Sequence, residues 1–226
     1  MPISFFICLD FMSLVGVIGI LRFKQLSTPL RYIEGHIIYS VVSGWTEHVL
    51  GSYYHVNNLW LIHFNTLINL TLLLAALYCW RFSKWNGILL RWSLYSYIVI
   101  WIVGKFSFEP LSGLDVYSNT FAQLIQIIFS VWLMMTVLKD TRIVWKNDSR
   151  FWVASGVIIY VTSTFLLFGF FNVLLTWSPQ MLKVIWHINW YAIILTFGFF
   201  LRSFFCKPER TSQDLVVGAT DDLLVQ

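Results

Sequence analysis

The sequence predicts an all-α, polytopic membrane protein with seven transmembrane helices. Of its 226 residues, 58% are hydrophobic and only 12% are charged, and the mean hydropathy is +0.72. A soluble domain carries about 25% charged residues, so this composition indicates a chain whose solvent is lipid. Two further observations support the class: seven apolar segments have spanning length, and basic residues gather in alternate loops.

Each apolar segment is near or above the roughly 20 residues that a spanning helix needs. The approximate limits are 3–22, 32–53, 57–80, 88–107, 118–138, 150–174 and 179–205. The last segment has a clear start, because Ser178 supplies a capping hydroxyl and Pro179 occupies the first turn. We therefore predict one bundle over 1–206, followed by a short flexible cytoplasmic tail over 207–226.

Basic residues gather in the loops after the first, third and fifth segments and after the seventh. They are Arg22, Lys24, Arg31, Arg81, Lys84, Arg91, Lys139, Arg142, Lys146, Arg150, Arg202, Lys207 and Arg210. The alternate loops at 54–57, 108–117 and 175–178 contain no Lys or Arg. By the positive-inside rule, the amino terminus lies outside the cell and the carboxyl terminus in the cytoplasm.

Four of the predicted helices carry a stripe of polar residues at helical spacing. The stripes are His36, Ser40, Ser43 and Glu47; Asn58, Asn65 and Asn69; Asn119, Gln123, Gln126 and Ser130; and Gln180, Lys183 and His187. Residues three, four and seven apart share one helix face. Because polar side chains are costly in lipid, these faces should turn toward one another or toward a water-filled cavity.

The depths of the polar residues predict a pocket in the outer half of the membrane. At about 1.5 Å per residue, Glu47 and His63 lie roughly 9 Å below the outer ends of their helices. Gln123 and Gln126 lie about 8–12 Å down, and His187 about 12 Å down. The residues predicted to form this outward-facing ligand pocket are Glu47, Asn58, His63, Gln123, Gln126, Lys183 and His187.

Glu47 is the strongest functional candidate, because an ionisable residue inside a span is rarely incidental. The alternative is a structural pair in which Glu47 locks two helices together. His63 lies roughly 140° around its helix from Asn58, so it should face other neighbours than the asparagine stripe does. Lys183 either extends to the membrane surface or attracts an anion into the pocket.

The sequence bears on two kinds of cofactor, a metal ion and retinal. Glu47, His63 and His187 are weak candidates for a two-histidine, one-carboxylate zinc or iron site. The chain contains no HExxH, HxxxH or CxxC spacing, so all three ligands would come from separate helices. No retinal is expected, because the last helix has no lysine near its middle and Lys183 lies too close to the outer end.

Two stretches carry a resemblance: LRFKQLSTPLRYI (21–33) and NNLWLIHFNTLI (57–68). They resemble a group of small bacterial membrane proteins of about this length, from the first predicted helix to the seventh. The resemblance implies a multi-pass protein of the bacterial cell (plasma or inner) membrane. It also places Asn58 and His63 in that group's pattern, but it implies no reaction, ligand or catalytic residue.

We expect the chain to bind a small polar ligand or ion from outside and to signal to a partner protein. Glu47 would be the charged anchor, and Asn58, Gln123, Gln126 and His187 would orient the ligand. One alternative is an intramembrane metal-dependent hydrolase that acts on lipid. Another is a proton-coupled small-molecule carrier, because His36, Ser40, Ser43 and Glu47 follow one line along a helix. The expected surroundings are the lipid bilayer and a signalling partner, with no nucleic acid.

Overall fold

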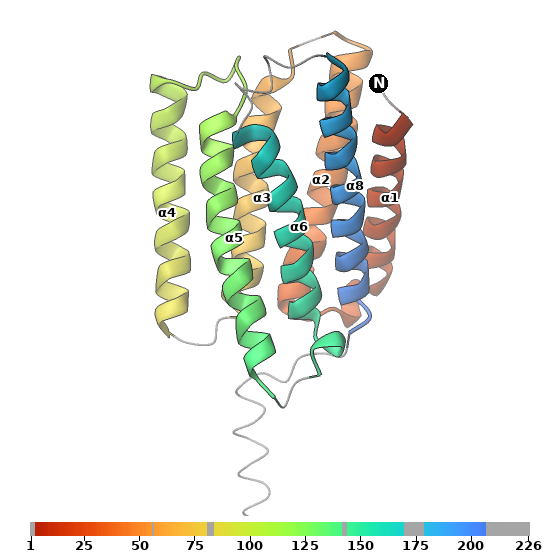
Figure 1. Ribbon diagram of the computed structural model, residues 1–226, viewed down its shortest axis with the longest axis vertical. Helices are drawn as coiled ribbons and strands as arrows, with labels where there is room; N and C mark the ends of the chain where they lie inside the picture. The colour runs from red at the N-terminus through yellow and green to blue at the C-terminus, as the bar shows by residue number, and fades with distance from the viewer. Residues whose placement is uncertain (1–2, 56, 81–83, 142–143, 170–178, 207–226) are drawn as a thin grey trace, which may run out of the picture.

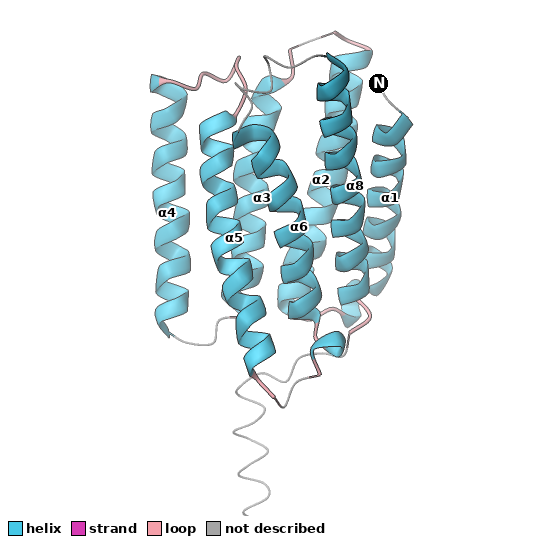
Figure 2. Cartoon of the chain, viewed as in Figure 1, coloured by secondary structure: helices cyan, strands magenta, loops and turns pink. Residues whose placement is uncertain are grey.

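The computed structural model of the protein describes residues 3–55, 57–80, 84–141, 144–169 and 179–206. Within these ranges the regular structure is helical, as predicted (Figure 2). The α-helices are α1 (Ile3–Arg22), α2 (Thr28–Ser52), α3 (Leu59–Cys79), α4 (Lys84–Ser107), α5 (Val116–Lys139), α6 (Ser149–Gly169) and α8 (Pro179–Ser203). Two short 3₁₀ helices are η1 (Phe23–Gln25) and η2 (Trp145–Asn147). The predicted tail at 207–226 lies outside the described residues.

The helix ends follow local sequence signals. Ser27 is extended and Pro29 lies in the first turn, so α2 begins four residues before the predicted limit of 32. The side-chain oxygen of Asn57 accepts the backbone N–H of Leu59 at 3.0 Å, where α3 begins. The last helix begins at Pro179, as predicted from the preference of proline for the first turn of a helix.

Six of the helices form a closed ring, and α4 lies outside it (Figure 1). Around the ring, α1 packs against α2, α2 against α3, and α3 against α5. From there α5 packs against α6, α6 against α8, and α8 returns to α1. Helix α4 packs against α3 and α5, on the outer side of the pair. The ring therefore has an interior to which α4 does not contribute.

Glycines allow close approach at two helix pairs of the ring. Gly19 of α1 lies directly against the buried carboxyl group of Glu34 on α2, which occupies the space of a β-carbon. At a second pair, Gly156 of α6 meets Phe200 of α8. The hydroxyl of Thr196 there donates to the Gly156 carbonyl at 3.0 Å. Small residues and interhelical hydrogen bonds of this kind hold helices together in a bilayer, where the hydrophobic effect does not drive helices to associate.

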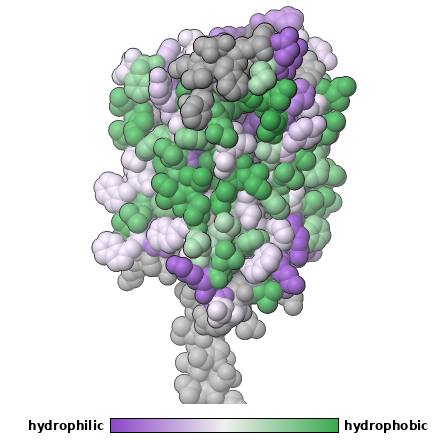
Figure 3. Space-filling model, in the orientation of Figure 1, coloured by the Kyte–Doolittle hydropathy of each residue, from purple (hydrophilic) through white to green (hydrophobic). Residues whose placement is uncertain are grey.

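Six helices of the described chain are long and apolar enough to cross a membrane: α1, α3, α4, α5, α6 and α8. Helix α2 has sufficient length at 25 residues, but Glu34, His36 and Glu47 lower its hydropathy. Figure 3 shows apolar side chains over the middle of the molecule, with hydrophilic residues mainly toward the two ends. These are the features of a multi-pass membrane protein. The seventh span and the direction of the chain in the membrane remain predictions.

Candidate functional site

The helix ring encloses a central cavity of about 270 Å³. All six ring helices contribute side chains to its wall, and no described residue of α4 does. From Trp186 to Phe200 on α8, the wall extends over about 21 Å along the bundle. The polar residues of the wall are His36, Ser40, Glu47, Asn65, Thr66, Asn69, Asn119, Gln123, Gln126, Tyr160, Thr164, Asn189 and Thr196. The cavity wall is thus mainly apolar, but it carries polar groups from five of the six ring helices.

Glu47 is held in the cavity wall by hydrogen bonds between α2 and α3. Its Oε1 atom accepts from the amide of Asn65 at 3.0 Å and from the hydroxyl of Ser43 at 3.3 Å. The row continues along α3, where Asn69 donates to Asn65, and returns to α2, where Ser40 donates to Asn69. The Oε2 atom takes no hydrogen bond from a described residue. One carboxylate oxygen is therefore fixed, and the other is left for a further partner.

The opposite wall carries amides and hydroxyls from α5, α6 and α8. The amide of Gln123 donates to Asn119 at 3.1 Å within α5. The hydroxyls of Ser163 and Thr164 on α6 both donate to Asn189 of α8 at 3.3 Å. These bonds orient the wall without using all of its polar atoms.

Two buried polar atoms of wall residues have no hydrogen-bond partner among the described residues. They are Oε1 of Gln123 and Nδ1 of His36. Unpaired buried polar atoms are costly and uncommon. Moreover, no described lysine or arginine lines the cavity, so Glu47 faces no protein cation there. The wall thus has unused acceptor capacity.

Aromatic side chains flank the polar groups of the wall. Trp190 contacts Phe5 edge to face, with ring centroids 5.1 Å apart, and stacks on Trp186 at 6.2 Å. Toward the end of the bundle where α8 stops, the wall contains Leu73, Phe197 and Phe200. The His36 ring lies there, edge to face against Phe200, with ring centroids 6.0 Å apart. Glu47 lies nearer the end that contains the amino terminus of α1, where the neighbouring His48 contacts Phe5.

Three of the predicted pocket residues line the central cavity: Glu47, Gln123 and Gln126. Asn58 lies beside it, where its amide donates to the backbone carbonyl of Glu47 at 3.0 Å. His63 lies elsewhere, in a second polar cluster.

The two remaining predicted residues, Lys183 and His187, do not line the cavity either. His187 Nδ1 contacts the backbone carbonyl of Lys183, one turn earlier on α8. Ile193 lies on the cavity face of α8 and is roughly 120° around the helix from His187. That angle turns His187 away from the cavity, and Lys183 is exposed nearly one turn before Trp186, the first described wall residue of α8.

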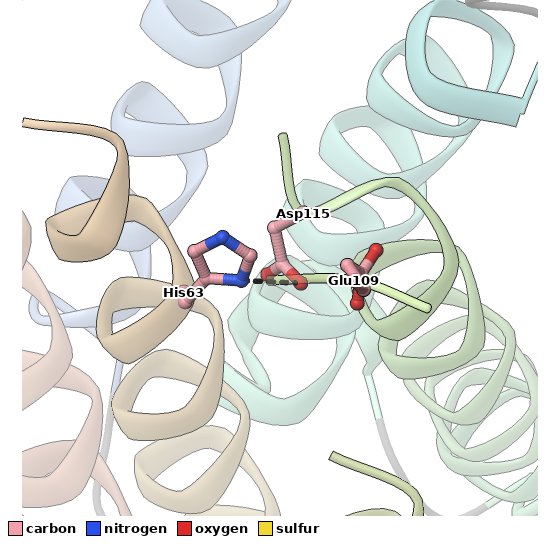
Figure 4. A group of neighbouring side chains, drawn as sticks. All are labelled: His63, Glu109 and Asp115. Carbon is pink, nitrogen blue, oxygen red and sulfur yellow. Dashed lines mark ion pairs between the residues drawn. The ribbon is translucent and has the colours of Figure 1, made fainter. Parts of the chain in front are cut away.

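A second polar cluster, called here the Lys105 cluster, consists of His63, Lys105, Glu109 and Asp115 (Figure 4). The ammonium of Lys105 lies 2.9 Å from Oε2 of Glu109, 2.9 Å from Oδ1 of Asp115 and 2.5 Å from Nδ1 of His63. The Nε2–H group of His63 donates to the carbonyl of Gly113 at 3.0 Å. The cluster joins α3 and α4 to the loop that leads into α5.

The carboxylate of Glu109 also anchors the start of α5. It accepts hydrogen bonds from the backbone N–H groups of Tyr117 and Ser118. Such N–H groups in the first turn of a helix have no partner within the helix itself. Burial alone would raise the pKa of the nearby Asp115 carboxyl group. The contacts from His63 and from the Lys105 ammonium outweigh burial and hold that pKa below its ordinary value of 3.8. Lys105 contacts both carboxylates, and Glu109 also holds the first turn of α5, which favours a structural role for the cluster.

The predicted metal ligands do not come together. Among the described residues, the group with metal-like geometry is His63, Glu109 and Asp115, without Glu47 or His187. The ammonium of Lys105 already contacts all three of those side chains. The ammonium occupies the position that a metal ion would take, and its positive charge would repel a divalent ion. The residues therefore do not fit a zinc or iron site, and the geometry does not favour the metal-dependent hydrolase.

Several wall residues were not among the predicted pocket residues. Helix α6 contributes Tyr160 and Thr164, α8 contributes Asn189, and α1 contributes Phe5 and Cys8. The spacing of Tyr160 and Thr164, one turn apart on an apolar helix, was a usable signal. Phe5 and Cys8 carried no signal, because an apolar residue in a spanning helix faces lipid as readily as a cavity.

Comparison with protein-family models, curated proteins and solved structures found no match for this chain. The resemblance of 21–33 and 57–68 to small bacterial membrane proteins therefore stays a prediction. Any function must be argued from the cavity itself.

Proposed function

We propose that this chain is a membrane receptor that binds a small polar ligand or ion in the central cavity, entering from outside the cell. The observation that carries the proposal is Glu47, whose carboxylate is half hydrogen-bonded and faces the cavity without a protein cation. Binding sites combine a mainly apolar wall with a few convergent polar groups, and this cavity has both. The bound state would reach a cytoplasmic or membrane partner through the loops at the opposite end.

Native mass spectrometry of the purified protein tests the proposal. We expect a small-molecule adduct on the wild type that is lost in Glu47→Gln, with thermal unfolding nearly unchanged. Glu34→Gln is the matched control, because Glu34 lies on the same helix, is fully buried and does not line the cavity. If Glu47→Gln does not fold, or if no small polar molecule binds or stabilises the wild type, the proposal is wrong.

A second function, a proton-coupled carrier, is favoured by the hydrogen-bonded row of Glu47, Asn65, Asn69 and Ser40. His36 lies one turn beyond Ser40 and also lines the cavity. Polar rows that include a carboxylate and a histidine serve as proton relays in membrane transporters. In proteoliposomes a carrier would change the internal pH when substrate is added, and Glu47→Gln would abolish that change. Absence of proton flux with retained binding would favour the receptor.

A further inference from the structure

We propose that the ligand of the central cavity is a small organic cation that carries N–H groups: a protonated primary or secondary amine. This inference rests on the proposed function and specifies its ligand class. It follows from three properties of the cavity wall: its charge, its unused hydrogen-bonding atoms and its aromatic surface.

The wall carries one acidic group and no described basic residue to pair with it. Glu47 is the one carboxylate among the described wall residues, and no described lysine or arginine lies there with it. The basic side chain of the Lys105 cluster is already engaged by Glu109 and Asp115 and does not line the cavity. An ionised group inside a membrane protein requires a partner of opposite charge. A cationic ligand provides that partner, whereas an anion would be repelled.

The unused atoms of the wall are acceptors of hydrogen bonds. Oε1 of Gln123 can only accept, and Oε2 of Glu47 accepts when ionised. Nδ1 of His36 is unpaired too, but it lies three turns of α2, about 16 Å, from Glu47 and does not belong to the same ligand contact. A ligand that satisfies the two oxygens must bring several donors. An ammonium group with two or three N–H bonds donates to the Gln123 and Glu47 oxygens, whereas a quaternary ammonium does not. An inorganic cation would instead coordinate these oxygens, and sodium as a probe separates the two cases.

The aromatic wall suits the same chemistry. Phe5, Trp186 and Trp190 form a contiguous aromatic surface in the cavity wall. Cations are attracted to the faces of such rings, and most strongly to tryptophan. The volume of about 270 Å³ is near the lower end for ligand pockets, which run from about 300 to 1,000 Å³. The ligand is therefore a small amine rather than a peptide or a lipid.

Binding to the full-length wild type in detergent tests the ligand class with a size-matched panel. The probes are benzylamine, benzyl alcohol and benzoate, with tetramethylammonium and sodium ions as donor-free cations. We expect benzylamine to bind and to raise the unfolding temperature, with the other four at least tenfold weaker. Binding is measured by isothermal titration calorimetry at neutral pH and constant ionic strength.

Three variants locate the binding. Glu47→Gln should weaken benzylamine binding roughly 10- to 100-fold, as expected for loss of a charge-assisted hydrogen bond. Gln123→Met should weaken it about 3- to 10-fold, because it removes one neutral acceptor. Glu34→Gln should leave binding unchanged. If Glu47→Gln does not fold, the probe selectivity of the wild type and the Gln123→Met result still decide the proposal.

The outcomes separate the ligand class from the proposed function. If benzyl alcohol or benzoate binds as well as benzylamine, the cavity is a binding site but the cationic class is wrong. If tetramethylammonium or sodium binds equally well, the donor requirement is wrong. If none of the probes binds to the wild type, the amine proposal is overturned; a co-purified adduct of other chemistry would then still support the receptor.

Discussion

At the scale of single residues, the Lys105 cluster shows how a chain can bury four titratable groups near one end of a bundle. Lys105 lies between two carboxylates, and His63 is fully buried beside them. Each charged group of the cluster contacts a group of opposite charge, so removing one leaves a buried charge without a partner. The resulting loss of folding stability can be measured, and it tests the structural role of the cluster.

Replacing Lys105 by methionine should be strongly destabilising. It would leave Glu109 and Asp115 buried without their shared cation, which costs about 3–5 kcal/mol. Thermal unfolding in detergent measures the loss. Lys183→Met is the control, because Lys183 is exposed, and it should change stability by under about 0.5 kcal/mol. Equal effects of the two changes would contradict the structural role.

Asp115 should make the protein sensitive to acid. Its pKa in the folded state is lowered below 3.8, so the stability it contributes is present above that pH. The contribution is lost as the pH falls below 3.8 and through the folded-state pKa. We expect Asp115→Asn to be less stable than the wild type at pH 7 and to lose less stability between pH 5 and pH 3. Asp10→Asn, at an exposed position, is the control for this titration. If the stability of Asp115→Asn falls with pH in parallel with that of the wild type, Asp115 does not cause the acid sensitivity.

At the scale of helices, the contact of Gly19 with Glu34 fixes how closely α1 and α2 pack. A β-carbon at Gly19 would lie 1.8 Å from the nearest carboxylate oxygen of Glu34. We expect Gly19→Ala to cost about 1–3 kcal/mol of unfolding free energy, because the buried Glu34 side chain or the two helices must shift to make room. The double variant with Glu34→Ala should recover much of that loss.

Gly198→Ala is the matched control for the helix contact. It lies within α8, and no atom lies within 4 Å of a β-carbon built there. Alanine is the better helix former, so this variant should gain about 0.5–1 kcal/mol. If Gly19→Ala is also stabilising, α1 and α2 are not in contact at this point.

Helix positions were well predicted from the sequence, but helix faces only in part. Pro179 and the apolar runs set the ends to within a few residues for most helices. The stripe through Glu47, Gln123 and Gln126 lies in the cavity wall. The stripe through Lys183 and His187 does not, because the cavity face of α8 is set by packing against α1 and α6. Such packing is a property of neighbouring helices and leaves no periodic signal in one of them.

At the scale of the whole molecule, the function depends on a ring of six helices around a cavity with polar groups in its wall. The ring order could not be predicted from the sequence, since α3 neighbours α5 and α4 is excluded from the interior. The Lys105 cluster likewise joins residues more than 40 positions apart. The partnership of His63 with Lys105, Glu109 and Asp115 arises because the loop before α5 folds back onto α3 and α4.

The proposed receptor requires a cavity that small polar molecules can reach from outside the cell. Labelling of a cysteine in its wall tests this most directly, in intact cells with a membrane-impermeant thiol reagent. Asn119→Cys would be used after Cys8, Cys79 and Cys206 are changed to serine, with Leu138→Cys, an exposed position at the other end of α5, as the control. We predict labelling of Asn119→Cys from outside and none of Leu138→Cys. Labelling of Asn119→Cys only after the cells are opened, or not at all, would contradict the account.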